Sequence, residues 1–357
     1  MENNKPKFGL RELVLIIVTI GFVVFLVFFA IFVINFIRPT PTPEVISIQA
    51  TVASEEESAG ITDSLNRLTG FDFDEVVDLI SSEDSPNIYV AYSNESGPYS
   101  YQGTNNRPMG FEIDLLSEIE ERWFNRTGVF VFKAIDASER LDTILSGDYD
   151  IVAGAVSETS ERCSAALCSS PLHMFDTAAV MIQSDSGIKD FSEIDEFCAF
   201  FEGNRVGVVV GTTGVGRLPS VFDNCSSGPS IEEYRTRQDV VNGLVNNNIV
   251  GYITDSSILH YYAELNGSEA SVVSFEDAVG GVSLERYTFL IAPDDEGLKD
   301  LFDLTLAAMV CDGTFDAIVA PYKQYLSDEF GDGITLNQSQ CSLIEEQPNK
   351  IRQLISN

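Results

Sequence analysis

The stretch GDYDIVAGAVSETSER, Gly147–Arg162, decides how this chain of 357 residues folds. Asp150–Val156 is a short apolar run with β-branched side chains between turn residues, a pattern typical of a buried strand. The cluster Ser157-Glu-Thr-Ser160 follows directly, and its hydroxyl groups suit the start of a helix. The stretch therefore predicts a buried strand that leads into the N-terminus of a helix.

The same turn predicts a receptor for a small carboxylate. Backbone N–H groups and hydroxyls point to one place there, and Arg162 lies one helical turn further along the chain. A helix end, hydroxyl donors and a guanidinium together suit a carboxylate. The alternative is a capped helix whose arginine contacts only solvent.

The N-terminal part of the chain predicts a membrane anchor. Residues 13–37 form an almost unbroken apolar run, about the length that crosses a bilayer as one helix. The run does not end in the small residues of a cleavable signal peptide, although cleavage stays the alternative. The basic residues that precede it place residues 1–12 in the cytoplasm. We expect a single-pass protein of the cell membrane whose remaining residues lie outside, extracellular or periplasmic, on a Pro/Thr-rich and acidic stalk over 38–85.

Charge and cysteine content limit the possible functions. The net charge of −34 argues against nucleic acid as a partner and against adsorption to anionic lipid. An even number of cysteines in an external domain indicates disulfides, and we expect nearest-neighbour pairing. The expected pairs are Cys163–Cys168, Cys198–Cys225 and Cys311–Cys341. With two distant histidines and no CxxC motif, we expect no metal site, no cofactor and no hydrolase triad.

Strand and helix patterns alternate along the external part, which predicts an α/β architecture with mainly parallel sheets. Strands are expected at 88–92, 129–134, 150–156, 206–210 and 250–254, extended segments at 177–183 and 286–292, and helices at 113–124, 140–146, 240–246, 257–265, 298–310 and 315–322. Ligands of such sheets bind beyond the carboxyl ends of the strands.

Two further candidate sites follow strands. Gly211-Thr-Thr-Gly214 could cradle an anion with backbone amides, although it could also be a simple turn, and it lacks the lysine of a nucleotide-binding loop. Asp255 ends the strand expected at 250–254, where a helix cap is the alternative role. With Arg162 these groups complement a zwitterion, with the carboxylate on Arg162 and the ammonium on Asp255.

Four blocks resemble the amino-acid-type (family 3) extracellular solute-binding proteins that serve ABC importers. Pro98-Tyr-Ser-Tyr101 and Gly110-Phe-Glu-Ile-Asp-Leu115 are similar to the family's PFSY and GFDVDL, and Gly147–Arg162 is similar to GKYDVIVAGMSITPER. The segment from Ser184 to Ile188 with the Gly211–Gly214 loop resembles KDSGIK and GTTG, and Cys311–Phe315 resembles ADGTY. The blocks follow the family's order over about two-thirds of the chain.

This resemblance implies a two-lobed, type II periplasmic-binding-protein-like fold with two hinge strands, behind one N-terminal transmembrane helix. Lobe 1 would comprise 86–178 with 286–327, lobe 2 would comprise 184–283, and 328–357 would form a C-terminal tail. The two lobes would close on a ligand between them. By position, the resemblance implies the ligand-binding residues Ser93, Ala155, Ser157, Arg162, Thr212, Thr213 and Asp255.

Departures from the family leave the ligand open. Ser96 and Ser138 stand where relatives often carry aromatic side chains, and Ser93 stands in place of an early aspartate. Such a pocket favours a ligand that forms hydrogen bonds over one that stacks, unless these residues face solvent.

Three functions compete at this point. The first is a membrane-anchored, monomeric binding subunit that captures a small polar ligand and delivers it to an ABC permease. An amino acid is the ligand that we favour. The second is the ectodomain of a membrane sensor, and the third is a dehydratase-like enzyme on the same scaffold. The third would need an acid or base in the cleft, for which Glu95 and Glu158 are the nearest candidates, and we expect no enzyme.

Overall fold

The computed structural model describes residues 87–170, 174–280 and 285–326, together with Leu336, Cys341, Ser342 and Ile344. The predicted cytoplasmic segment, anchor and stalk lie outside the described residues. Within the described ranges, no single helix is long and apolar enough to cross a membrane. The consecutive helical segments Glu296–Cys311 and Thr314–Tyr325 pass that test only as a pair, and they are bent by 81° against each other.

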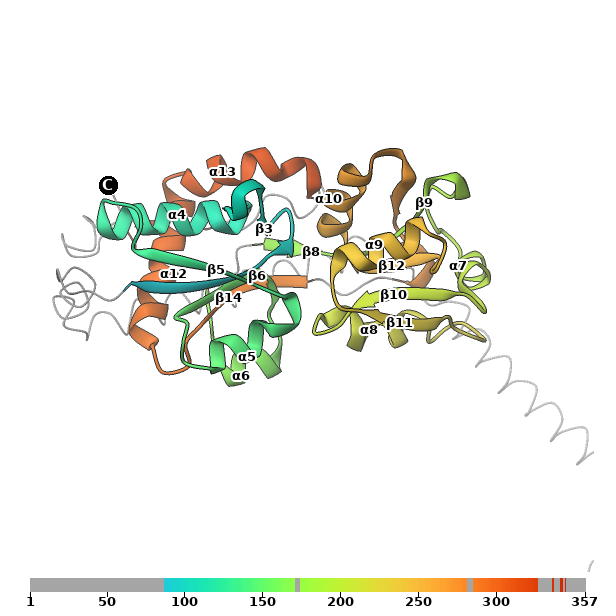
Figure 1. Ribbon diagram of the computed structural model, residues 1–357, viewed down its shortest axis with the longest axis horizontal. Helices are drawn as coiled ribbons and strands as arrows, with labels where there is room; N and C mark the ends of the chain where they lie inside the picture. The colour runs from blue at the N-terminus through green and yellow to red at the C-terminus, as the bar shows by residue number, and fades with distance from the viewer. Residues whose placement is uncertain are drawn as a thin grey trace, which may run out of the picture. The chain divides into compact units, whose positions relative to one another are not determined.

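The first lobe is built on a mixed sheet with the strand order β5-β1-β6-β14-β7, and β8 also pairs with β14. The strands are β1 (Ile88–Ser93), β5 (Phe130–Ile135), β6 (Ile151–Ser157), β7 (Leu167–Cys168), β8 (Met174–Asp176) and β14 (Glu285–Ile291). Strand β1 runs parallel to β5 and β6, whereas β14 runs antiparallel to β6, β7 and β8. Every residue of β6 is buried, as expected of a strand that helices cover on both faces. Figure 1 shows α4 (Phe111–Phe124) on one side of this sheet and α5 (Arg140–Leu145) with α6 (Ser160–Ala165) on the other.

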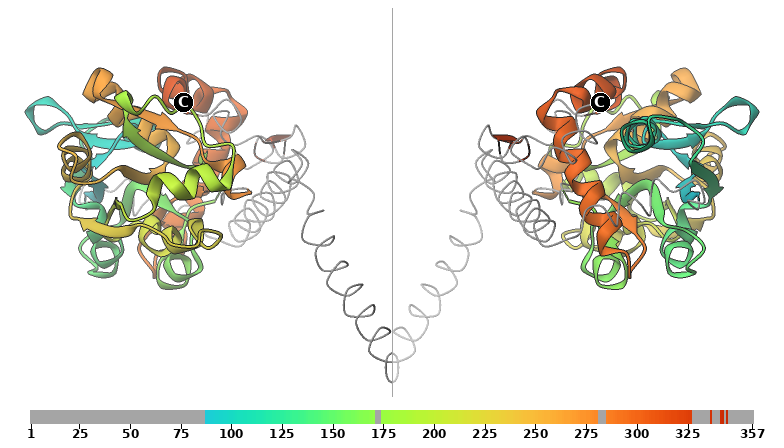
Figure 2. Two further views of the ribbon diagram at one scale, coloured as in Figure 1. Left: turned by 90° about the vertical axis from the view of Figure 1, so that its right-hand side faces the viewer. Right: turned by 90° about the vertical axis from the view of Figure 1, so that its left-hand side faces the viewer.

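Aromatic side chains fill the core between this sheet and the C-terminal helices α12 (Glu296–Cys311) and α13 (Thr314–Val319). Figure 2 shows these helices, at the red end of the colour scale, beside α4. Phe302 of α12 meets Trp123 edge-on with ring centroids 6.3 Å apart, and Phe315 of α13 meets Phe111 at 5.6 Å. These contacts fix α4, and with it the residues at its N-terminus, against the sheet.

The second lobe has a five-stranded sheet in the order β11-β10-β12-β9-β13. Its strands are β9 (Ala178–Gln183), β10 (Arg205–Val209), β11 (Ser230–Tyr234), β12 (Gly251–Asp255) and β13 (Ala270–Val273), and its helices are α7 (Ile194–Phe201), α8 (Thr213–Val221), α9 (Arg237–Val245), α10 (Ser256–Asn266) and α11 (Glu276–Val279). Apolar residues of α9 and α10 belong to one core cluster and those of α7 and α8 to another, so the helices cover both faces of the sheet. Strands β10, β11 and β12 are parallel, whereas β9 is antiparallel to its two neighbours.

Short elements complete the structure. A small antiparallel sheet comprises β2 (Glu95–Ser96), β3 (Ser100–Gln102) and β4 (Pro108–Met109), and the 3-10 turns are η1 (Thr104–Asn106), η2 (Ala137–Glu139), η3 (Ser184–Ser186), η4 (Gly267–Glu269) and η5 (Ala320–Tyr325). The chain passes from the first sheet to the second at Thr177, the single residue between β8 and β9. It returns through 281–284, which lie outside the described residues.

The structure places disulfides at Cys163–Cys168, Cys198–Cys225 and Cys311–Cys341, the pairs that nearest-neighbour pairing predicts. Two expectations need correction. The sheets are mixed rather than mainly parallel. In the first sheet β14 runs antiparallel to its neighbours, and in the second sheet β9 does. The short strands β7, β11 and β13 and the helix α8 were not predicted, because their apolar residues are too few. Helix α7 was also not predicted, although Ile194, Phe197, Cys198 and Phe201 follow the helical period.

Candidate functional site

The turn within β6 has an unusual backbone conformation. Gly154 and Ala155 both have positive φ, at 126° and 52°. Glu112, at the start of α4, accepts hydrogen bonds from the N–H groups of both residues, and Arg140 donates from Nη1 to both of their carbonyls. A left-handed alanine costs about 1–2 kcal/mol. The two buried ionic side chains therefore hold the end of β6 in a conformation that the local sequence does not favour.

Arg162 lies directly beyond this turn. The hydroxyl of Thr159 caps α6 by accepting from the Arg162 N–H at 3.2 Å. The guanidinium donates from Nη1 to the Ser157 carbonyl at 2.8 Å and from Nη2 to the Gly211 carbonyl in the second lobe at 3.4 Å. Burial lowers the pKa of Arg162, and the charge of Asp255 opposes that shift. The predicted receptor thus faces the other lobe rather than open solvent.

The loop Gly211–Thr213 meets the first lobe from the opposite side. Gly211 has a φ of 73°, and a Cβ built on it would lie 2.5 Å from the Cα of Ser138. Thr213 Oγ1 lies 3.4 Å from Ser157 Oγ and donates to Glu285 at 3.5 Å. The Thr212 hydroxyl donates instead to the Val209 carbonyl at 2.7 Å. Of the two predicted threonines, Thr213 therefore makes the side-chain contacts between the lobes.

Asp255 is the last residue of β12 and immediately precedes α10, yet its side chain makes no capping hydrogen bond to that helix. The cap comes from the first lobe, where Asp176 of β8 accepts from the N–H of Ser257 and from its hydroxyl. Asp255 is 8% exposed and lies near the buried phenol of Tyr287, whose pKa is raised first by burial and then by the charges of Asp255 and Asp176. The Tyr287 hydroxyl itself donates to Asp176 at 3.3 Å. The helix-capping alternative for Asp255 is therefore not what the structure contains.

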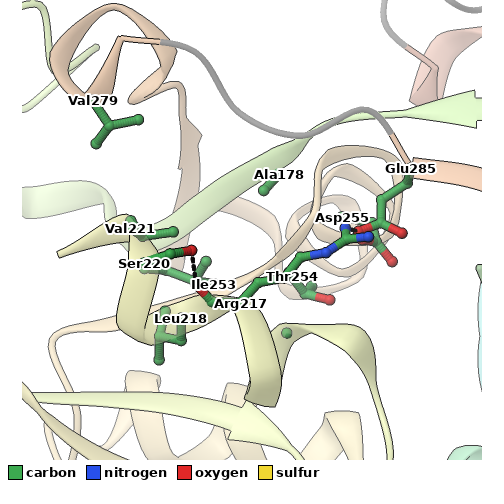
Figure 3. A pocket seen from close by; sticks show the side chains of 11 residues that line it. Ala178, Arg217, Leu218, Ser220, Val221, Ile253, Thr254, Asp255, Val279 and Glu285 are labelled. Atoms are coloured by element: carbon green, nitrogen blue, oxygen red, sulfur yellow. Dashed lines mark hydrogen bonds and ion pairs between the residues drawn. The ribbon is translucent and has the colours of Figure 1, made fainter. Parts of the chain in front are cut away.

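Arg217 extends from α8 toward Asp255 and Glu285 (Figure 3). Its guanidinium forms an ion pair with Glu285, the first residue of β14, which is almost fully buried. Burial lowers the pKa of Arg217, whereas the charge of Asp255 raises it. Asp255 thus lies in the field of arginines from both lobes, Arg162 and Arg217.

A cavity of about 530 Å³ opens between α5, α6 and α8. It is lined by three arginines, Arg140, Arg162 and Arg217, and by hydroxyl-bearing residues that include Ser138, Thr159, Thr212 and Thr213. Arg140 is 3% exposed. Burial and the charges of Arg162 and Arg237 lower the pKa of Arg140 to about 9. The cavity has the size of a small-molecule site and the lining of an anion receptor.

The remaining predicted residues lie deeper. Ser93, Ser96 and Ser100 are all fully buried, so Ser93 and Ser96 do not face solvent. Ser96 donates to Ser93 Oγ at 2.8 Å, and Ser100 donates to the Ser93 carbonyl at 2.7 Å. The Ala155 N–H donates to the Glu112 carboxylate, and the Ala155 carbonyl accepts from Arg140. In the part of the chain that the structure describes, no group of three or more His, Cys, Asp or Glu side chains could hold a metal ion.

Sequence reasoning did not assign roles to Glu112, Asp176, Arg217 or Arg237, and it named Arg140 only as a residue near the pocket that could bias the choice of ligand. Glu112 carried a signal, since it lies inside the block Gly110–Leu115 that supports the family resemblance. For the other four no local pattern distinguishes a buried functional side chain from a solvated one. Their roles depend on contacts between segments far apart in the sequence.

The chain is similar to known proteins over most of its described residues. The family model for bacterial extracellular solute-binding proteins, family 3, matches residues 88–325. The chain is 22% identical over 260 residues to the glutamate-binding protein GluB of Corynebacterium efficiens, which covers 71% of this chain and 82% of that relative. It is 25% identical over 237 residues to the octopine-binding periplasmic protein of Rhizobium meliloti, covering 61% of this chain and 77% of the relative. The solved cysteine-binding protein of Campylobacter jejuni has a TM-score of 0.60 at 15% identity and covers 73% of this chain and 99% of that structure, a likeness that establishes the two-lobed α/β fold.

Proposed function

Because the chain belongs to the bacterial extracellular solute-binding proteins of family 3, we propose that it captures a small amino acid by closure of its two lobes. Glutamate and cysteine, the ligands named for two of the relatives, are both amino acids. The observation that carries the proposal is the position of Arg162. This partly buried guanidinium of the first lobe reaches the Gly211 carbonyl of the second, and no ion pair to a carboxylate of a described residue neutralises it.

The α-carboxylate of the ligand would bind Arg162, with hydroxyl groups of Ser157 and Thr213 beside it. Ser157 and Thr213 come from different lobes and lie 3.4 Å apart, so a carboxylate bridging them makes contacts that only the closed form offers. A ligand that binds one state better than the other shifts the equilibrium toward that state. The carboxylate would therefore act as the trigger for closure.

The α-ammonium would pair with Asp255. That carboxylate makes no capping bond to α10, since Asp176 performs this task, and it lies within the electrostatic reach of Arg162. An amino acid would place its positive end on Asp255 and its negative end on Arg162, as the charges of the site require.

We propose binding rather than catalysis. The two carboxylates considered as acids or bases are both engaged, because Glu158 forms an ion pair with Arg286 at 2.6 Å and Glu95 accepts from the Arg237 N–H at 2.9 Å. Burial raises the pKa of Glu95 and its Oε1 has no hydrogen-bond partner, so the proposal of binding without catalysis rests on the family to which the chain belongs.

The biological role that we propose is delivery of the captured amino acid to an ABC permease. The chain would be anchored in the cell membrane by residues 13–37, with a monomeric binding domain outside. The apolar run and the preceding basic residues support the anchor. The family to which the chain belongs supports the external location.

Thermal unfolding of the full-length chain in mild detergent tests the proposal. The panel comprises L-amino acids, their D-enantiomers, their deaminated acids, and polyols as solutes without charge. A ligand at a hundredfold excess over Kd adds about 2.7 kcal/mol of stability, which raises the Tm by roughly 5 °C. We expect this shift with one or a few L-amino acids and not with the corresponding D-enantiomers or deaminated acids. A shift with a polyol alone, or with no member of the panel, contradicts the proposal.

A further inference from the structure

A buried arginine of the second lobe lies outside the zwitterion receptor. Arg237 is the first residue of α9, and it is 1% exposed. Its guanidinium donates from Nη1 to the Tyr252 hydroxyl at 3.1 Å and from Nη2 to Ser96 Oγ in the first lobe at 3.5 Å. The buried Nε has no hydrogen-bond partner. Among the described residues, no carboxylate oxygen lies within the 4.0 Å of an ion pair with this guanidinium.

The nearest acidic side chains attract this guanidinium without forming an ion pair with it, and the buried Oε1 of Glu95 has no hydrogen-bond partner. Glu95 faces Arg237 across the lobes, but it accepts from the Arg237 backbone N–H rather than from the guanidinium. Asp255 also attracts Arg237, yet it is the group that would hold the ligand ammonium. A buried charge without a paired counter-ion is costly, so the site favours an additional negative group.

A line of serines connects Arg237 to the carboxylate receptor. The guanidinium touches Ser96, which donates to Ser93 at 2.8 Å. Ser93 in turn lies against the strained turn of β6, since a Cβ on Gly154 would be 2.4 Å from the Ser93 Cβ. Ser96 and Ser93 thus connect Arg237 to the turn that precedes Arg162. The charge of Arg237 accordingly acts on Arg140 beside that turn and lowers its pKa.

We propose that Arg237 is a specificity-determining residue that binds the side-chain carboxylate of an acidic amino acid. The inference rests on the proposed function, because the α-carboxylate and α-ammonium of the ligand occupy Arg162 and Asp255 and leave a third charge for Arg237. The Arg237 Nε, which has no hydrogen-bond partner, supplies a donor for a carboxylate. A cationic side chain would meet Arg237 with like charge, and a neutral one would leave it unpaired.

The test is calorimetric titration of the full-length chain with glutamate, aspartate, glutamine, asparagine and arginine, repeated with Arg237→Gln. The unaltered protein should bind one of the two acidic amino acids at least tenfold more tightly than its amide. Arg237→Gln should lower the affinity for that acid at least tenfold while changing the affinity for the amide less than threefold. Circular dichroism and Tm of the variant without ligand establish that it is folded.

Arg235→Gln is the matched control. Arg235 lies two residues earlier, its side chain is 74% exposed, and it also crosses the lobes by pairing with Asp136 at 2.9 Å. Its loss removes an arginine contact between the lobes but not the buried guanidinium, so the preference for the acid over its amide should persist.

Four results would overturn the inference. Equal binding of acid and amide by the unaltered protein would show that Arg237 does not select a carboxylate. Equal losses for both ligands in Arg237→Gln would mean that Arg237 only joins the lobes. Binding of neutral or basic amino acids alone would leave the proposed function standing and refute the acidic ligand, whereas binding of no amino acid would refute both. If Arg237→Gln fails to fold, Ser96→Val tests the same point, and it should weaken the acid more than the amide.

Discussion

The carboxylate of Asp176 in the first lobe accepts hydrogen bonds from the N–H and the hydroxyl of Ser257 in the second. Asp176 also accepts from the N–H of Thr177, the residue that joins the two sheets. Burial, and then the charge of Asp255, raise the pKa of Asp176 to about 7. One carboxyl group therefore links the lobes, caps α10 and titrates near neutral pH.

Stability should fall with pH because of Asp176. An acid whose pKa is raised on folding binds more protons in the folded than in the unfolded state, so its contribution to stability is present at low pH and is lost as pH rises through about 7. The difference in Tm between the unaltered protein and Asp176→Asn should decrease from pH 5 to 7 and become constant above pH 8, as thermal unfolding at each pH would measure. Parallel curves for the two proteins would show that Asp176 titrates normally.

Gly211→Ala should prevent closure. A Cβ at this position would lie 2.5 Å from the Cα of Ser138, and a φ of 73° already disfavours any other residue. We expect ligand affinity to fall at least tenfold in titration calorimetry. The unfolding free energy should fall by about 1 kcal/mol, because alanine is disfavoured at this φ. The control is Gly214→Ala, three residues further along in the first turn of α8. There the nearest atom to the added Cβ lies 3.4 Å away. Its affinity should stay near that of the unaltered protein, and equal losses would contradict the steric argument.

Arg162→Ala should abolish most amino-acid binding. The substitution removes the charge-assisted partner of the ligand carboxylate and leaves that carboxylate in the closed cleft, a loss of about 3 kcal/mol or roughly a hundredfold in Kd. Calorimetric titration would measure it. The neighbouring Glu161→Ala leaves the guanidinium in place and serves as the control. An Arg162→Ala affinity within twofold of the unaltered protein would refute the assignment.

Asp255→Asn should weaken the binding of an amino acid more than the binding of its deaminated analogue. Without the carboxylate, an amino acid loses its ion pair, whereas the deaminated acid has no ammonium to lose. We expect the Kd for the amino acid to rise at least tenfold and the Kd for its deaminated analogue to stay constant or fall. Competition binding with both ligands gives the comparison, and equal losses would mean that Asp255 does not hold the ammonium.

Loss of the Cys198–Cys225 disulfide should destabilise the second lobe. The bond closes a sequence separation of 27 residues, whose loop entropy corresponds to about 3.5 kcal/mol. The Cys163–Cys168 bond closes only 5 residues and should contribute about 2 kcal/mol. Denaturant unfolding of the two paired Cys→Ala variants gives both values. A larger loss for Cys163–Cys168 would contradict the loop-entropy argument.

The sequence predicted the parts of the fold that local patterns specify. The apolar run at 150–156 gave β6, and the hydroxyl cluster after it contained Thr159, which caps α6. The direction of the strands could not be predicted in the same way. Whether β14 runs parallel or antiparallel to β6 depends on how the chain crosses between the lobes.

The positions of some candidate site residues were predictable to the same degree. Arg162, Thr213 and Asp255 follow strand ends, and the structure brings them to the meeting of the lobes. That Asp176 rather than Asp255 caps α10 could not be read from the sequence, since the two residues lie in different lobes. Arg237 was missed for a similar reason. At a helix start it resembles any surface arginine, and only the packing of Ser96 against it makes it a buried charge.

The connection at Thr177 would confine a closing rotation of the lobes, along this path, to very few torsions. On one side Asp176 is held in register with Glu285, and on the other Ala178 is held in register with Asp255. The Thr177 carbonyl accepts from the Ser256 N–H at 2.7 Å, so even this residue is bound to the second lobe through half of its peptide. Relative rotation of the sheets along this path must therefore turn about the bonds that flank Thr177, as about a pivot. Since Asp255 is in register with Ala178 beside that pivot, the proposed ammonium site would lie close to the axis, where a small rotation of the lobes moves it least.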